Sequence, residues 1–428
     1  MIQVTIILLL VLVGLSLPVA AAMGLLGLAL TESYSFLPLA SAMGDMAWST
    51  STKFILLAIP LYILMGEILL RAGVADRMYG AMEAWMSWLP GGLMHSNFAF
   101  SGIFAATSGT SVATAATVGT VAIPQIEKQG YNRSLFLGTL AAGGTLGILI
   151  PPSTNMILYG LLTETSIPRL YLAGFLPGLL LVALFIGATL MICWLVPGTR
   201  GTRTRHGWSE RFRTLPSLIA PLVIFLLVVG SIYAGIATPA ESGALGLIAA
   251  LGMAWKNRRL NWPMLCEALL ATMRTTAMSM ALLVAAYFLN FVIGSIGLTA
   301  RINQLIVDLD LTPYALLLVV VVFYFVLGMF MDTLTMMVAT IPIIAPSIFA
   351  AGFDPVWFGV LMMILIEMAM ITPPVGLNLF VIQGIREEGE ISEVMIGALP
   401  YVFTMLAFII LITIFPQIVL FGPDLLSN

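Results

Sequence analysis

Hydroxyl side chains and a glycine gather at one point of an otherwise apolar stretch, in the run Thr107-Ser-Gly-Thr-Ser111. Hydroxyl oxygens, with carbonyls freed where glycine interrupts a helix, suit a hard monovalent cation such as sodium. Roughly ten residues separate Phe98 from this run, which as helix is about 15 Å, half the hydrocarbon depth of a bilayer. We therefore predict a hairpin tip near the middle of a membrane. Close helix packing is the alternative, and we prefer it for Thr114, Thr117 and Thr120.

Asp332 is the single acidic residue deep in a second apolar stretch, residues 325–342. A carboxylate inside a membrane is costly unless it is paired or lines a polar cavity. This one could bind a cation, contact substrate, or cap a helix by accepting from the amides of Thr335 and Met336, and these roles are compatible. Glu367, about one to two turns before a later break, could support the site or pack against a hairpin amide.

Two proline pairs, Pro151-Pro152 and Pro373-Pro374, interrupt apolar segments. Proline supplies no amide donor and clashes with the preceding turn, so each helix should open there and its freed carbonyls can coordinate an ion. Asn155 and Asn378 place an amide just past each break. A simple kink is the alternative, but two kinks at equivalent repeat positions, each beside a hairpin, favour a functional site.

The elements that position these residues must lie in lipid, because 60% of the 428 residues are hydrophobic and only 9% are charged. Soluble proteins carry about 25% charged residues. The first segment lacks the basic leader of a signal peptide, so we expect a retained membrane helix. Spans are predicted at roughly 2–17, 18–32, 53–71, 133–162, 170–197, 215–236, 240–255, 270–297, 355–384 and 396–422.

The composition also argues against other classes of protein. A net charge of −3 gives no indication of a nucleic-acid partner. The isolated Cys193 and Cys266 make neither a disulfide framework nor a metal site. No nucleotide-binding loop, zinc-protease motif or plausible catalytic triad is found, so an enzyme is not expected. Glu67 and Glu241 lie outside the hairpins and are expected to fix interfaces.

The two halves of the chain repeat each other. Pro124 and Pro346 are 222 residues apart, as are the two proline pairs, and Pro177 and Pro400 are 223 apart. A nearly constant offset indicates an internal repeat. The basic connectors 198–214 and 256–259 should both be cytoplasmic by the positive-inside rule.

That assignment makes both termini periplasmic and requires residues 89–127 and 312–351 each to enter and leave on one side. The first re-entrant hairpin then opens to the cytoplasm and the second to the periplasm, so the repeats are inverted. We predict an all-α polytopic membrane protein with these parts: scaffold helices 1–88; first hairpin and broken helix 89–197; connector 198–214; scaffold helices 215–311; second hairpin and broken helix 312–428.

Five stretches resemble the large membrane subunit of TRAP transporters, the DctM-like family, namely residues 107–111, 144–155, 237–242, 328–332 and 372–381. The resemblance implies an elevator-type secondary transporter of the bacterial inner membrane that imports an organic acid, such as sialic acid or a C4-dicarboxylate. Sodium ions would drive it, with two sites and no metal cofactor. The implied partners are a small four-helix membrane subunit (DctQ-like), separate because this chain has no N-terminal extension, and a periplasmic substrate-binding protein (DctP-like).

The resemblance also implies site residues. One sodium ion would lie by the first tip and first break, at Ser108, Gly109, Thr145 and Asn155. The other would lie by the second hairpin and second break, at Gly328, Asp332, Thr333 and Thr372. Substrate would lie between them, at Thr107, Ser111, Ser153, Thr154, Gly376 and Asn378.

Two other functions stay open from the sequence. A passive channel or permease for a small anion could also use re-entrant loops, although it needs neither paired ion-binding breaks nor a partner that delivers substrate. A membrane enzyme or a non-transporting scaffold would need a catalytic set that the sequence lacks. Which organic acid is carried depends on cavity shape and on the binding protein, and the sequence specifies neither.

Overall fold

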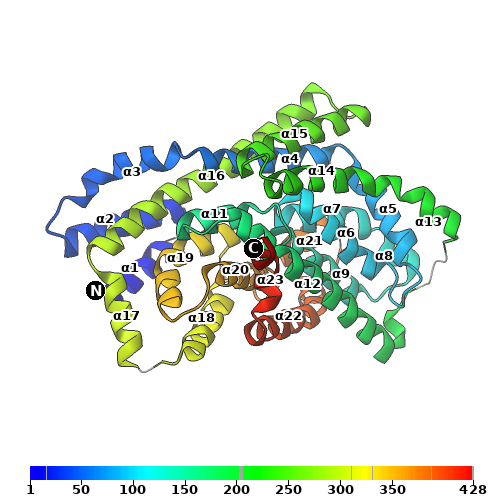
Figure 1. Ribbon diagram of the computed structural model, residues 1–428. Coiled ribbons are helices and arrows are strands. Elements are labelled where there is room, and N and C mark those ends of the chain that lie inside the picture. Colours follow the sequence, from blue (N-terminus) through cyan, green and yellow to red (C-terminus); the bar gives the residue numbers. More distant parts are fainter. Residues whose placement is uncertain (16, 202–205, 310, 330, 387, 427–428) are drawn as a thin grey trace.

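The computed structural model describes residues 1–15, 17–201, 206–309, 311–329, 331–386 and 388–426, and every regular element in these ranges is a helix (Figure 1). Part of the predicted connector 198–214 therefore lies outside the described residues. The predicted all-α membrane fold is confirmed. The first half begins with α1 (Ile2–Gly14), α2 (Val19–Tyr34), η1 (Leu39–Ser41), α3 (Ala42–Ser51), η2 (Phe54–Leu57), α4 (Ala58–Arg71) and α5 (Val74–Met86).

The remaining helices follow the predicted order of hairpin, broken helix and long helix in each half. The first half continues with α6 (Leu93–Ser108), α7 (Ser111–Ala122), α8 (Gln125–Gln129), α9 (Arg133–Gly144), α10 (Leu146–Leu149), α11 (Thr154–Thr163), α12 (Ile167–Leu195) and η3 (Pro197–Thr199). The second half has α13 (Trp208–Thr214), α14 (Pro216–Tyr233), α15 (Pro239–Lys256), α16 (Trp262–Ser295), α17 (Leu298–Asp308), α18 (Pro313–Leu327), α19 (Thr333–Ala350), α20 (Pro355–Met370), α21 (Leu377–Ile385), α22 (Ile391–Ile414) and α23 (Gln417–Leu426).

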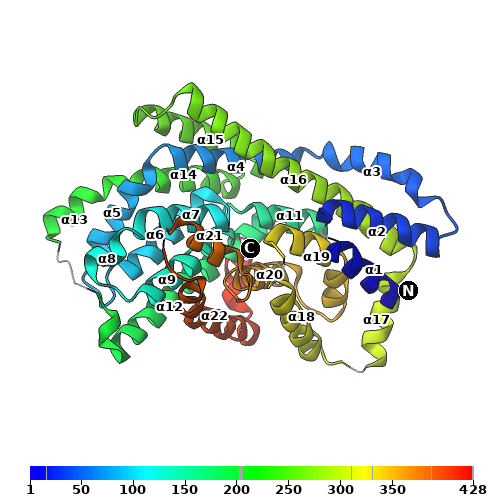
Figure 2. The ribbon, with the colours of Figure 1, turned by 180° about the vertical axis from the view of Figure 1, so that it is seen from behind.

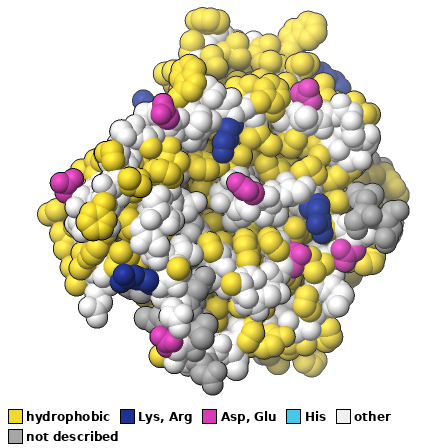
Figure 3. Space-filling model, turned by 60° about the vertical axis from the view of Figure 1, so that its left-hand side comes forward, with side chains coloured by type: hydrophobic (Ala, Val, Ile, Leu, Met, Phe, Trp, Pro, Cys, Tyr) yellow, Lys and Arg dark blue, Asp and Glu magenta, His cyan; other side chains and the backbone are white. Residues whose placement is uncertain are grey.

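Six helices of the described chain are long and apolar enough to cross a membrane, and a seventh crossing results if the bent pair 133–163 is one span. Five of the six match predicted spans. The sixth, Thr333–Ala350, is predicted instead as a hairpin arm, and length does not decide between these alternatives. The predicted spans 2–17 and 18–32 form the shorter helices α1 and α2, because Pro18 separates them. Hydrophobic side chains dominate the face drawn in Figure 3, and its charged side chains are few and scattered.

The packing has the twofold character that a repeat requires. Equivalent helices begin 222 residues apart for α9 and α20 and for α7 and α19, and 223 apart for α11 and α21. Equivalent helices of the two repeats also make equivalent contacts. Helix α2 packs on α16, and its equivalent α15 packs on α4. In the same way α9 packs on α22 and α20 on α12, while α7 packs on α21 and α19 on α11. Figures 1 and 2 show α3, α4, α14, α15 and α16 along one side, with the hairpins and broken helices beneath them.

Small residues let the α9 and α22 backbones touch. A Cβ on Gly138 would lie 1.9 Å from the carbonyl oxygen of Gly397, and a Cβ on Gly397 would lie 1.7 Å from the carbonyl oxygen of Ser134. Glycine is used in this way where membrane helices gain stability from close van der Waals contact. The contact ties the first broken helix to the last long helix of the second repeat.

Replacing Gly138 by alanine should destabilise the protein, because the added Cβ would force α9 and α22 apart. Overpacking of this kind typically costs about 1–3 kcal/mol. Gly187→Ala on α12 is the matched control, since its Cβ would meet no atom of the described residues within 4 Å. We expect thermal unfolding in detergent to begin at a lower temperature for Gly138→Ala alone. Equal unfolding midpoints for the two variants would contradict this packing.

Candidate functional site

The predicted hairpin tip forms a tight turn between two helices. Helix α6 ends at Ser108, Gly109 has a φ of 62°, Thr110 is extended, and α7 begins at Ser111. Glycine adopts this left-handed conformation without the steric cost that a Cβ brings, so it allows the chain to reverse within two residues. Thr107 and Ser108 are buried, with their hydroxyl groups bonded to the Phe104 carbonyl and to Thr114.

The first tip lies directly against the first break. The Thr154 hydroxyl donates to the carbonyl oxygen of Gly109 at 3.3 Å. A Cβ on Gly109 would lie 3.1 Å from the carbonyl oxygen of Pro152, and a Cβ on Gly147 would lie 2.5 Å from that of Thr110. Backbone thus meets backbone at this point, and there is no room for larger side chains.

The first break is buried and bent. The helices on either side of residues 150–153 are inclined by 46°, which confirms the helix break predicted at Pro151-Pro152. Ser153 begins α11, and its hydroxyl accepts from the amide of Met156 at 3.4 Å. The Thr145 hydroxyl donates to the Ala142 carbonyl at 2.6 Å. Asn155 is buried, and among the described residues its side-chain nitrogen has no hydrogen-bond partner.

The second break is more exposed than the first. Helix α20 ends at Met370, α21 begins at Leu377, and Gly376 between them has a φ of 36°. The helix break predicted at Pro373-Pro374 is therefore confirmed. The Thr372 hydroxyl donates to the Met368 carbonyl at 2.7 Å. Pro374 and Val375 are exposed, whereas both prolines of the first break are buried, so the two breaks have different surroundings.

Asp332 caps helix α19. Its carboxylate accepts from the amides of Leu334 at 3.1 Å and Thr335 at 3.2 Å. The predicted cap is confirmed for Thr335 but is wrong for Met336, whose amide donates to the backbone carbonyl of Asp332 in the first turn of the helix. A residue at the N-cap position reaches the second and third amides of the helix, which accounts for the difference.

The second set of predicted sodium ligands is less closely gathered than the first. A Cβ on Gly328 would lie 2.0 Å from that of Ala369, so the start of the second turn packs on α20 just before the second break. Thr333 is partly buried at the start of α19. In the part of the chain that the structure describes, no hydrogen bond joins Asp332 or Thr333 to Thr372. Phe330 in the same turn lies outside the described residues.

A buried polar cluster joins the first tip to the second broken helix. The Ser111 hydroxyl lies 2.6 Å from Oε2 of Glu367, 3.0 Å from the Gly144 carbonyl and 3.3 Å from Nδ2 of Asn378. Asn378 also donates to the Ala141 carbonyl at 3.3 Å. Glu367 thus contacts a hairpin hydroxyl, and the expected hairpin amide is not its partner. The sequence feature that pointed to this contact is the lone carboxylate of Glu367 in an otherwise apolar helix.

Helix α4 covers the other side of the first tip. A Cβ on Gly66 would lie 2.9 Å from the carbonyl oxygen of Ser108. A small pocket between α4 and the hairpin is lined by Ile63, Gly66, Glu67, Leu70, Phe104, Ser108, Thr110 and Ala113. Of the predicted substrate ligands, Thr154 is hydrogen-bonded to the Gly109 carbonyl of the tip and Ser111 to the Gly144 carbonyl of the first broken helix. Gly376 lies at the second break, where it is itself buried.

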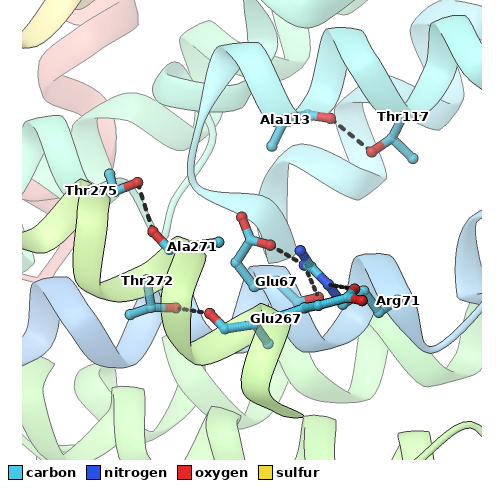
Figure 4. Close-up of polar contacts among 9 residues, drawn as sticks. Glu67, Arg71, Ala113, Thr117, Glu267, Ala271, Thr272 and Thr275 are labelled. Carbon is cyan, nitrogen blue, oxygen red and sulfur yellow. Dashed lines mark hydrogen bonds and ion pairs between the residues drawn. The ribbon is translucent and has the colours of Figure 1, made fainter. Parts of the chain in front are cut away.

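An ion-pair network lies beside that pocket (Figure 4). Arg71 is paired with Glu67 on its own helix and lies 3.5 Å from Glu267 on α16, with α7 facing them. Glu67 itself pairs within α4, and it is Arg71 that reaches the neighbouring helix α16, so the interface role expected for Glu67 stays a prediction. For Glu241 it is wrong, since this carboxylate is exposed and forms a capping box with Thr238 at the start of α15.

The chain matches one family along nearly its whole length. Residues 6–418 match the family described as "Tripartite ATP-independent periplasmic transporter, DctM component". The C4-dicarboxylate TRAP transporter large permease protein DctM of Vibrio cholerae is 30% identical, over 96% of each chain. The ectoine TRAP transporter large permease protein TeaC of Halomonas elongata is 31% identical, over 86% of each chain.

A solved structure has a similar fold. The YdaH transporter of Alcanivorax borkumensis superposes with a TM-score of 0.59 over 90% of this chain and 88% of its own, at 17% sequence identity. At that identity the likeness concerns the fold alone.

Ser111→Ala should destabilise the protein, because it leaves Oε2 of Glu367 and the Gly144 carbonyl without their hydroxyl partner in a buried place. An unsatisfied buried polar group costs about 1–3 kcal/mol. Thr120→Ala is the matched control on the same helix, since that hydroxyl is exposed and bonds only within its own helix. Thermal unfolding in detergent measures both variants. A loss for Thr120→Ala as large as that for Ser111→Ala would refute the special role of the cluster.

Proposed function

This chain belongs to the DctM component family of tripartite ATP-independent periplasmic (TRAP) transporters, and from this we propose that it is the membrane subunit of a sodium-coupled, binding-protein-dependent importer of an organic acid. Membership makes it a multi-pass membrane transport component and not an enzyme. The observation that carries the finer proposal is the meeting of the first hairpin tip with residues of both helix breaks.

The first sodium site would lie where the first tip meets the first break, at Ser108, Gly109, Thr145 and Asn155. The hydroxyl groups of Ser108 and Thr145 have hydrogen-bonding partners, but an oxygen keeps acceptor lone pairs when it donates its proton. Gly109 offers a backbone carbonyl at the tip. This oxygen-rich, buried donor set suits a hard cation, which binds oxygen in preference to nitrogen or sulfur.

The second sodium site would combine Gly328, Asp332, Thr333 and Thr372. Asp332 brings a formal negative charge, and its Oδ2 accepts both amide hydrogen bonds of the cap. The other carboxylate oxygen is then the natural cation ligand. The two sites would therefore differ in charge, because the first has only neutral oxygen donors.

Substrate would lie between the sodium sites, close to Thr107, Ser111, Ser153, Thr154, Gly376 and Asn378. The support for this position is that Ser111 of the first tip and Asn378 just past the second break meet there, with 3.3 Å between the Ser111 hydroxyl and Nδ2 of Asn378. Two relatives are named for C4-dicarboxylate and for ectoine, so the proposal keeps to an organic acid, with sialic acid and C4-dicarboxylates as candidates.

Movement would follow the elevator pattern, in which residues 89–197 and 312–428 carry the sites and residues 1–88 and 215–311 stay fixed. The support is that hairpins and broken helices pack on one another across the repeats. The subunit would lie in a bacterial inner membrane with both termini periplasmic. Its partners would be a small four-helix membrane subunit and a periplasmic substrate-binding protein.

Uptake by proteoliposomes that contain the chain with both partners should require an inward sodium gradient. Radiolabelled C4-dicarboxylate and sialic acid are the first substrates to test, each with its cognate binding protein. We expect accumulation with sodium outside, and none when sodium is equal on both sides or replaced by potassium. Accumulation to equilibrium only, at the same rate with and without the gradient, would instead identify a passive permease for small anions.

Asp332→Asn should raise the sodium concentration that gives half-maximal uptake by about tenfold or more, equivalent to about 1.4 kcal/mol of lost binding energy. Asparagine is a good N-cap, so α19 should stay intact. Asp354→Asn is a closely matched control, because Asp354 caps α20 through two amides in the same way but lies outside the proposed site. An unchanged sodium dependence in Asp332→Asn would remove this residue from the site.

A further inference from the structure

Glu367 is a buried carboxyl group, and no residue that the structure describes gives it a cationic partner. It lies in α20 with 1% of its surface exposed. The Ser111 hydroxyl is the one side chain that interacts with it in the described part of the chain, and its Oε1 has no hydrogen-bond partner. An ionised carboxylate with one unsatisfied oxygen is very costly in such surroundings, whereas a neutral carboxylic acid costs far less.

Counting protons at Ser111 leads to the same result. Its hydroxyl carries one proton and lies near two acceptors, the Gly144 carbonyl at 3.0 Å and Oε2 of Glu367 at 2.6 Å. Asn378 Nδ2, the third neighbour, is itself a donor and supplies no acceptor. If Ser111 donates to Gly144, the 2.6 Å contact with Glu367 needs a proton on the carboxyl group. Both contacts are satisfied only when Glu367 is protonated.

We propose that Glu367 is a proton-binding site that links the first hairpin tip to the second broken helix. The neutral carboxyl donates to Ser111, Ser111 donates to the Gly144 carbonyl, and Asn378 donates to Ser111. On release, the O–H bond of Glu367 breaks and the proton passes to water. The remaining carboxylate would need the single Ser111 proton, which breaks the bond to Gly144 and loosens the tip.

No other titratable group neutralises Glu367 in the described chain. The hydrogen-bonding network around it contains only hydroxyl, amide and carbonyl groups. The titratable side chains on or next to the elements around α20 are Arg133, Tyr159, Glu164, Arg169, Tyr171, Cys193, Tyr314, Tyr324, Asp332, Asp354, Arg386, Glu393, Tyr401 and Asp424. None of these is bonded to Glu367, so its own proton is the simplest source of neutrality.

The protonation follows from the contacts alone, whereas its effect on uptake rests on the proposed transport function. The two are therefore tested separately. The first test is infrared spectroscopy of the purified full chain in lipid. At neutral pH the wild type should have a carbonyl-stretch band of a protonated carboxylic acid that Glu367→Gln lacks. The control Glu267→Gln should keep this band, because Glu267 is exposed and faces Arg71.

Ser111→Ala tests whether the carbonyl-stretch band belongs to Glu367 while leaving the Glu367 carboxyl group in place. Loss of the hydrogen-bond acceptor should shift the band in frequency and leave its intensity unchanged, so the test holds even if Glu367→Gln does not fold. The proposal is overturned if wild type and Glu367→Gln have the same spectrum at neutral pH. It is also overturned if the Glu367 carboxyl is ionised there, with or without bound sodium.

The second test is the pH dependence of uptake at a fixed sodium gradient. Wild-type uptake should fall at alkaline pH, approaching about tenfold per pH unit once most of the protein has lost the proton. Glu367→Gln keeps a donor to Ser111, so its uptake should not fall over that range, while Glu367→Asp should remain pH-dependent. A Glu367→Gln profile identical to wild type would refute the coupling. Absence of uptake by the wild type would refute the transport proposal and leave the spectroscopic result standing.

Discussion

Backbone polar groups removed from water must find partners inside the protein, and the structure depends on this constraint. Two helices are interrupted by proline pairs, and each interruption frees carbonyl and amide groups. The first tip and the first broken helix supply such partners to each other: the Thr154 hydroxyl donates to the Gly109 carbonyl, and the Ser111 hydroxyl lies against the Gly144 carbonyl at the end of α9. Asp332 satisfies two amides of the second hairpin. The first hairpin and the first broken helix are thus hydrogen-bond partners, whereas the second hairpin satisfies the start of its own helix α19 through Asp332.

The features that could be predicted from sequence are those encoded by a few adjacent residues. A glycine among hydroxyl residues predicts the turn at Gly109, a proline pair predicts an opened helix, and an aspartate before an apolar run predicts a cap. The link between Ser111 and Glu367 could not be predicted, because 256 residues separate them and no spacing pattern connects them. Only the crossing of the repeats brings the two together.

The two halves follow the same path but are not equivalent in their surroundings. The first break is buried beneath the first tip, while Pro374 and Val375 of the second break are exposed. The two tips also differ in their polar side chains, since the first carries neutral hydroxyl groups and the second carries the carboxylate of Asp332. A repeat preserves backbone geometry and leaves side chains free to diverge, so the two tips differ in charge although their backbones follow the same path.

The first tip has partners in both repeats, and this has an energetic consequence. Gly109 contacts its own break through Thr154, and Ser111, two residues later, contacts Glu367 and Asn378 of the other repeat. If a cation binds at Gly109 as proposed, it also restrains Ser111, which lies two residues later in the same tight turn. Binding there would favour the arrangement in which Glu367 holds its proposed proton. By linkage, protonation would favour cation binding to the same degree, so filling or emptying the proposed site at this tip would also affect the second broken helix.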